Sequence, residues 1–114
     1  MIFQSDVRIL TVMIEKTDRL IEVCNKHSDI EIENDYTLSD TIELEFQKLY
    51  EDSQRLSTEL IIYHPELHID DLRGIRNRVA HNYESVSLKI LIDTARNDIP
   101  VLREILLNFI MNNQ

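Results

Sequence analysis

Apolar side chains recur along the chain at intervals of three and four residues, which is the spacing of one face of an α-helix. The pattern predicts a first helix from about Ser5 to Lys26, with apolar positions numerous enough to cover two flanks. It predicts a second helix that starts near Ser39 or Asp40 and ends before Pro65, because proline disfavours helical geometry at the preceding residue. The acidic stretch Ser28–Asp35 breaks the pattern and is interpreted as a surface loop.

Two more helices are predicted in the second half of the chain. The third opens at Asp70 or Asp71, since a carboxylate suits both the cap and the positive start of a helix. The fourth runs from about Ser87 to Asn108, and Pro100 predicts a kink near Arg96–Ile99 because proline interrupts the hydrogen-bond ladder. Short connections between such helices predict an all-α, antiparallel bundle of four to five helices.

The composition favours one domain over residues 1–114. That length supports a single core, and one glycine with two prolines leaves little turn chemistry for a many-stranded sheet. The only cysteine, Cys24, excludes an intrachain disulfide and lies on the apolar face of the first helix, where we expect a small core residue. No signal peptide and no stretch of the ~20 apolar residues that span a membrane is apparent, so we expect a cytoplasmic protein.

Charge is distributed unevenly along the chain, whose net charge is -9. Residues 1–72 contain 17 acidic and 6 basic residues, whereas residues 73–114 contain 4 acidic and 6 basic residues. The segment 73–83 carries three arginines and no acid, and we call it the basic island. The overall sign argues against broad nucleic-acid binding, while the basic island favours a local site for phosphate or another anion.

The basic island holds residue types that suit the cleavage of RNA without a metal. His81 can give or take a proton near neutral pH, and Arg76 offers a permanently charged fork of donors that matches phosphate oxygens. A histidine would assist attack by the ribose 2′-hydroxyl or protonate the leaving 5′-oxygen, while the arginine would stabilise charge on phosphorus. Asn77 is a candidate for orienting the histidine or the substrate, and Arg78 is a weaker candidate for a substrate contact.

Helical geometry constrains this pair. Arg76 and His81 are five positions apart, which places them about 140° apart around a regular helix. Either the helix unwinds before His81, or the site is assembled from two chains. A two-fold dimer would set both arginines and both histidines around one cleft.

The pattern Arg-Asn-x-x-x-His-x-Tyr, late in a small all-helical chain, resembles the signature of HEPN domains and in particular of their HepT-like branch. The long opening helix, the second helix ending near Pro65, and the segments Leu72–Asn77 and Asn97–Pro100 also look like that branch. The resemblance implies a HEPN-type homodimer with the paired motifs at its interface. It also implies a metal-independent endoribonuclease toxin in which Arg76 and His81 are catalytic.

In the HepT-like family a cognate MntA-like nucleotidyltransferase antitoxin adds AMP to a tyrosine two residues after the motif histidine. The resemblance therefore implies that AMPylation of Tyr83 neutralises this protein. An alternative is a non-catalytic HEPN-fold subunit that binds a nucleotide or substrate for a nucleotidyltransferase. The acidic net charge favours that alternative, whereas the intact Arg76, His81 and Tyr83 favour the enzyme.

Structural roles compete with each of these assignments. Arg76 could serve an ion pair, His81 could end a helix, and Tyr83 could be a core aromatic. His64 and His68 have the i, i+4 spacing of metal ligands, but a proline lies between them and no further ligand is near. We therefore expect a solvated loop there, and neither a metal site nor a cofactor.

Overall fold

The computed structural model describes residues 4–72 and 85–113, with the side chains of residues 85–87 excepted. These residues form helices and short connections without a strand, which confirms the all-α prediction. Residues 69–72 are also helical. The other elements in chain order are α1 (Gln4–Lys26), α2 (Asp29–Asn34), α3 (Tyr36–Gln54), α4 (Thr58–Tyr63), the 3₁₀ turn η1 (Pro65–Leu67), α6 (Ser85–Asn97) and α7 (Ile99–Asn112).

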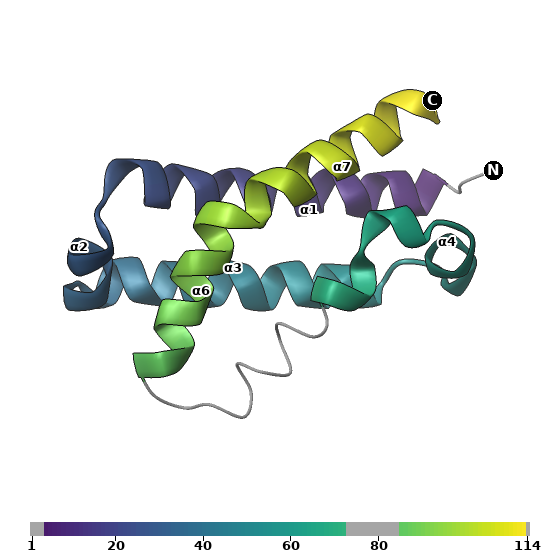
Figure 1. The fold of residues 1–114 in the computed structure, drawn as a ribbon. Helices are drawn as coiled ribbons and strands as arrows, with labels where there is room; N and C mark the ends of the chain where they lie inside the picture. Colours follow the sequence, from purple (N-terminus) through teal and green to yellow (C-terminus); the bar gives the residue numbers. More distant parts are fainter. Residues whose placement is uncertain (1–3, 73–84, 114) are drawn as a thin grey trace.

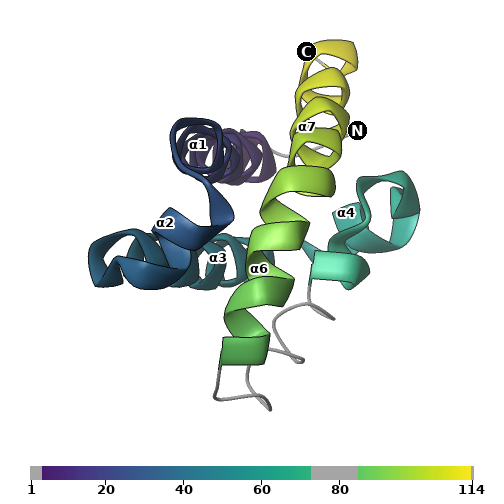
Figure 2. The same ribbon diagram turned by 60° about the vertical axis from the view of Figure 1, so that its left-hand side comes forward.

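The two longest helices, α1 and α3, lie side by side and run in opposite directions (Figure 1). Helix α6 crosses α3 steeply, and α7 then returns along α1, so that both chain termini lie at the same end of the molecule (Figures 1 and 2). This arrangement confirms antiparallel neighbours. The predicted count of four to five helices is wrong, because the described chain divides into shorter segments than the apolar pattern suggested.

The core is centred on α1, which packs against α3 on one flank and against α7 on another. Leu10, Met13 and Leu20 are fully buried along α1, as the apolar spacing predicts. Each such side chain contributes roughly 1.5–3 kcal/mol when it is removed from water. Cys24 is 4% exposed at the end of this face, and burial raises the pKa of its thiol. It is therefore a core residue, as expected.

The acidic stretch after α1 is a helix and not the surface loop that we predicted. Ser28 caps α2: its hydroxyl accepts from the backbone N–H of Glu31 at 3.2 Å, and the Glu31 carboxylate accepts from the backbone N–H of Ser28 at 3.3 Å. This reciprocal capping box satisfies two donors that a helix start leaves free. Ile32, on α2, is fully buried. One apolar anchor and one cap are enough to order a single short helix here.

The predicted second helix starts earlier than expected and is interrupted. The cap of α3 is Asp35, not Ser39 or Asp40. Its carboxylate accepts from the backbone N–H groups of Thr37 and Leu38, at 2.9 and 3.3 Å. The helix ends at Gln54, and α4 starts after Ser57. The predicted end before Pro65 is confirmed, since α4 stops at Tyr63.

A contact with α1 accounts for the interruption. The Asp6 side chain, 1% exposed, accepts from the backbone N–H of Ser57 at 2.9 Å and from its hydroxyl at 2.7 Å. The Ser57 hydroxyl in turn accepts from the N–H of Leu60 at 3.1 Å and caps α4. The buried carboxylate is satisfied by these donors, and it fixes the start of α4 against α1.

Two helix boundaries in the second half of the chain are set by a left-handed residue, His68, and by Pro100. The helix expected to open at Asp70 or Asp71 begins one residue before Asp70, directly after His68, whose φ of 56° and ψ of 35° are left-handed. The kink predicted from Pro100 is present as a full break at Asp98 between α6 and α7. In Figure 1 the two helices point in clearly different directions.

Candidate functional site

The residues predicted to carry the chemistry lie outside the described part of the chain. These residues are Arg76, Asn77, Arg78, His81 and Tyr83. The structure describes both flanks of their segment, which runs from residue 73 to residue 84. It therefore shows how the fold anchors the two ends of the candidate site.

The leading flank is anchored by two buried side chains. Ile69 and Leu72 are each 3% exposed on the short helix that precedes the basic island. His68 turns the chain into this helix: its N–H donates to the carbonyl of Pro65 at 3.1 Å, and its own carbonyl accepts from the N–H of Leu72 at 3.4 Å. A left-handed residue other than glycine costs roughly 1–2 kcal/mol, so packing of the flanking side chains must hold this turn.

The trailing flank is helix α6, which contacts α1, α3 and α7. Leu91 and Ile92 are each 1% exposed, and Ala95 is fully buried. The candidate segment therefore lies between two stretches that are fixed to one core, at Leu72 on one side and at Leu91 on the other.

Three of the four histidines of the chain are described, and each is paired with a carboxylate. The distances from the ring nitrogen to the carboxylate oxygen are 3.1 Å for His27–Glu31, 2.7 Å for His64–Glu66 and 3.2 Å for His68–Asp71. The hydrogen bond from the histidine lowers the pKa of Glu31 and of Glu66. The fourth histidine, His81, lies outside the described residues.

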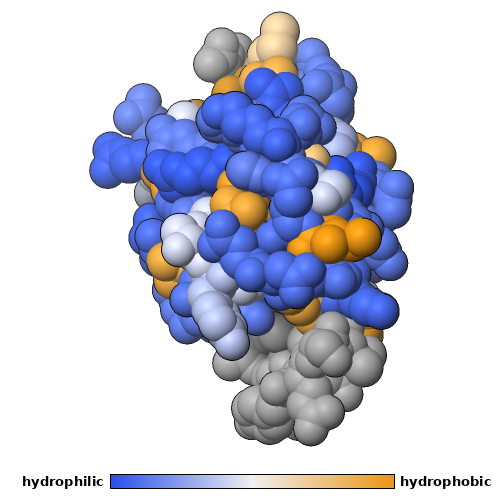
Figure 3. All heavy atoms as spheres, turned by 90° about the vertical axis from the view of Figure 1, so that its left-hand side faces the viewer, coloured by the Kyte–Doolittle hydropathy of each residue, from blue (hydrophilic) through white to orange (hydrophobic). Residues whose placement is uncertain are grey.

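The acidic part of the chain presents a hydrophilic surface. Helix α2 exposes Asp29, Glu31 and Glu33, and the end of the molecule that carries it is predominantly hydrophilic (Figure 3). Phosphate groups are repelled by such a surface and attracted to arginines.

The described residues give no sign of a metal centre or of a membrane span. Nowhere among them do three histidine, cysteine, aspartate or glutamate side chains gather so as to hold a metal ion. In the same part of the chain, no helix has the length and apolar character needed to cross a membrane.

A comparison with protein families decides the relationship. The family model described as "Ribonuclease HepT-like" matches residues 13–109, a stretch that includes the whole basic island and both of its flanks. The chain belongs to the HepT-like ribonuclease family. Membership implies ribonuclease activity and confirms the resemblance read from the sequence. Among solved structures, none matches this HepT-like chain significantly.

Sequence reasoning missed a pocket beside the leading flank. We expected His64 and His68 to lie in a solvated loop, but the His64 ring packs edge-on against Phe109, with 4.8 Å between the ring centroids. A pocket of about 190 Å³ opens between α4, η1 and the start of the next helix. Phe109 lies on α7, so no local sequence pattern could reveal that His64 packs against it.

Proposed function

We propose that this HepT-like protein is a metal-independent endoribonuclease toxin with Arg76 and His81 as its catalytic pair. The observation that carries the proposal is the family match over residues 13–109, because it spans both residues and implies a ribonuclease. The local charge supports it, since the basic island is free of acids in an otherwise acidic chain. The chemistry of the two side chains then selects the route.

The reaction starts from the 2′-hydroxyl of the nucleotide before the cut. One histidine removes its proton as the oxygen attacks the adjacent phosphorus, or, as an imidazolium, protonates the leaving 5′-oxygen. Arg76 stabilises the negative charge that builds on the phosphoryl oxygens. Asn77 orients the histidine or the substrate. The products are a 2′,3′-cyclic phosphate and a 5′-hydroxyl, and DNA is inert because it lacks the nucleophile.

The site is assembled across a two-fold homodimer. Residues five apart on one helix point in directions about 140° apart, so Arg76 and His81 of a single regular helix do not converge on one phosphate. A symmetry axis beside the motif brings the arginine of one protomer to the histidine of its partner. Arg78 contacts the backbone of the bound RNA.

The toxin is neutralised by modification of Tyr83. A cognate MntA-like nucleotidyltransferase antitoxin adds AMP to its hydroxyl. The added nucleotide carries negative charge beside the arginines of the basic island, and it occupies the cleft that the RNA phosphates need. Mass spectrometry after incubation with that transferase and ATP would show the mass of AMP on Tyr83, and its absence from Tyr83→Phe.

The ribonuclease proposal is tested by incubating the purified protein with RNA in EDTA. The wild type is expected to release 2′,3′-cyclic phosphate ends, whereas His81→Ala is expected to lose about 10²–10⁴-fold in rate. His27→Ala is the matched control, because it removes a described histidine that pairs with Glu31, away from the basic island and its flanks, and should retain activity. Equal cleavage by wild type and His81→Ala would show contamination and would overturn the proposal.

A second candidate function is a non-catalytic subunit that binds a nucleotide or substrate for a nucleotidyltransferase. The net charge of -9 favours it, because such a subunit needs no basic face for RNA. The same assay separates the two functions. No RNA cleavage by a protein that still binds ATP or the transferase would establish the subunit in place of the enzyme.

A further inference from the structure

The pocket at the junction of α4, η1 and the following helix has mixed walls. Ile61, Pro65 and Ile69 supply apolar surface on its sides. Its volume of about 190 Å³ is below the roughly 300–1,000 Å³ of pockets that enclose a whole small-molecule ligand. It is large enough for one long side chain of another molecule.

The charge around the pocket is acidic. Asp70 and Asp71 line it and are exposed. Among the described residues Asp71 pairs with His68 at 3.2 Å, whereas Asp70 makes no ion pair. From residue 56 to residue 72 the sequence has four acids and neither lysine nor arginine. The two carboxylates that line the pocket favour a cationic group there.

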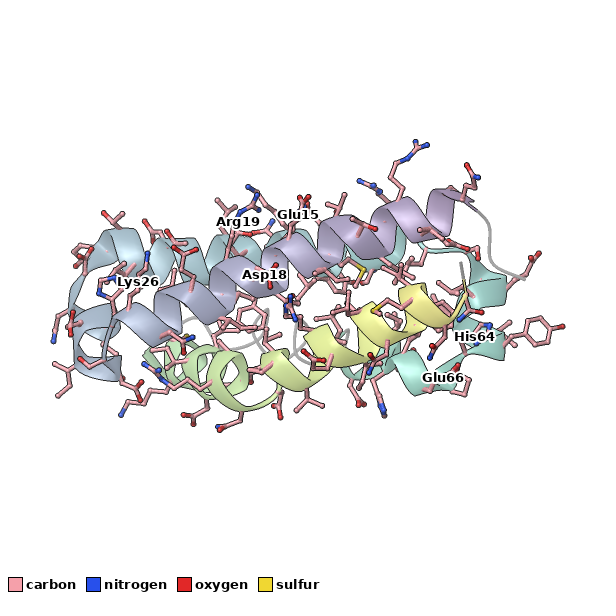
Figure 4. All side chains as sticks on the ribbon, turned by 90° about the horizontal axis from the view of Figure 1, so that it is seen from above. Glu15, Asp18, Arg19, Lys26, His64 and Glu66 are labelled. Atoms are coloured by element: carbon pink, nitrogen blue, oxygen red, sulfur yellow. The ribbon has the colours of Figure 1, made fainter. Side chains whose placement is uncertain are left out.

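Two large apolar side chains at the end of α4 are exposed. Ile62 and Tyr63 are 65% and 75% exposed and directly precede His64, which lines the pocket. Figure 4 shows His64 and Glu66 together at one end of the molecule, far from Lys26 at the other end. Large apolar and aromatic side chains of this kind are enriched at protein interfaces, where they act as anchors.

We propose that this pocket binds a basic side chain, preferentially arginine, of a partner protein. The methylene stem lies against Ile61 and Pro65, and the guanidinium donates to the carboxylates of Asp70 and Asp71. Ile62 and Tyr63 contact apolar side chains next to that arginine in the partner. Arginine is favoured over lysine because its planar fork serves two carboxylate oxygens at once.

This docking surface lies at the start of the helix that leads into the basic island. A partner held there is next to the segment that carries the candidate catalytic pair, so the surface offers a route to control the site without entering it. The proposal concerns binding alone, and it is measured without RNA and without any cleavage.

The test is an NMR titration of the full-length, ¹⁵N-labelled protein with the blocked peptide acetyl-Leu-Arg-Leu-amide. Saturable shifts are expected at the amides of His68, Ile69, Asp70 and Asp71. The same peptide with citrulline in place of arginine keeps the shape and loses the charge. Its affinity should be lower by a factor of about ten or more. Asp70→Asn should weaken the arginine peptide to a similar extent, and Tyr63→Ala should weaken it further.

The control variant is Asp40→Asn, which removes one exposed carboxylate from α3 and should leave the titration unchanged. Thermal melting of each variant shows that the fold is retained. Equal binding of the citrulline peptide, or equal weakening by Asp40→Asn, would overturn the proposal in favour of diffuse attraction. Agmatine binding as tightly as the peptide would overturn it as well, because the pocket would then be a site for small free cations.

Discussion

The guanidinium of Arg96, in the last turn of α6, lies 2.7 Å from the carboxylate of Asp29, in the first turn of α2. It also donates to the carbonyl oxygens of Cys24 and His27, at 2.5 and 2.8 Å. One side chain thereby joins the end of α1, the start of α2 and the end of α6. Because α6 is the trailing flank of the candidate site, this contact ties that flank to the core.

We expect Arg96→Ala to lower the free energy of unfolding by about 2–3 kcal/mol, since it removes charge-assisted hydrogen bonds to three partners. Arg103→Ala is the matched control. Arg103 has nearly the same side-chain exposure, 32% against 31%, but it reaches one residue on another helix, Asp18. Its loss should cost less than about 1 kcal/mol, as is usual for a surface ion pair. Urea denaturation measures both values, and similar losses for the two variants would contradict this account.

The buried contact between Asp6 and Ser57 predicts a second energetic difference. Asp6→Ala should destabilise by about 2–4 kcal/mol, because it leaves the Ser57 N–H without its buried acceptor and opens a small cavity. A double-mutant cycle with Ser57→Ala should give a coupling energy of about 1–2 kcal/mol. Asp40→Ala, an exposed carboxylate on α3, should change stability by less than about 0.5 kcal/mol. A coupling energy near zero would show that the two side chains act independently.

The capping box of α2 predicts a dependence on pH. The hydrogen bond from His27, and then that from the Ser28 N–H, hold the pKa of Glu31 below its ordinary value of 4.5. A carboxyl with a depressed pKa in the folded state stabilises the fold above its unfolded pKa and loses this contribution as the pH falls through the folded pKa. The wild type should therefore be more stable than Glu31→Gln at pH 7, and this difference in stability should disappear in acid.

Carboxyl NMR titration gives the direct measurement. His27→Ala should raise the pKa of Glu31 towards 4.5, and His68→Ala, which removes an imidazole paired with Asp71, should leave it unchanged. An unchanged pKa in His27→Ala would show that the imidazole does not act on Glu31.

Local patterns predicted the parts of the fold that depend on local physics. The apolar spacing gave α1 within a residue of its ends, and Pro100 located the break between α6 and α7. The cap of α2 was also present in the sequence as Ser28 and Glu31, three residues apart, and it was overlooked because acids dominate that stretch. An apolar count alone therefore underestimates short, capped helices.

Other features depend on contacts between distant residues. The break between α3 and α4 is fixed by Asp6, 51 residues from its partner Ser57, and the apolar spacing runs through this break without a sign of it. The contact between His64 and Phe109 is of the same kind. The candidate site is the opposite case, because its residue types and spacing are local, and together with the helical pattern of the chain they predicted the family that the comparison confirms.

The composite site predicts that two inactive variants restore each other. In a mixture of Arg76→Ala and His81→Ala chains, random exchange makes about half of the dimers mixed, and each mixed dimer keeps one arginine–histidine pair across the axis. Activity on the order of a quarter of the wild type should therefore return. The control is Arg76→Ala mixed with the double variant Arg76→Ala/His81→Ala, which leaves every dimer without an arginine at this position and should stay inactive. Native mass spectrometry confirms exchange. If mixed dimers form and remain as inactive as the control, the two residues act within one chain and the helix must unwind before His81.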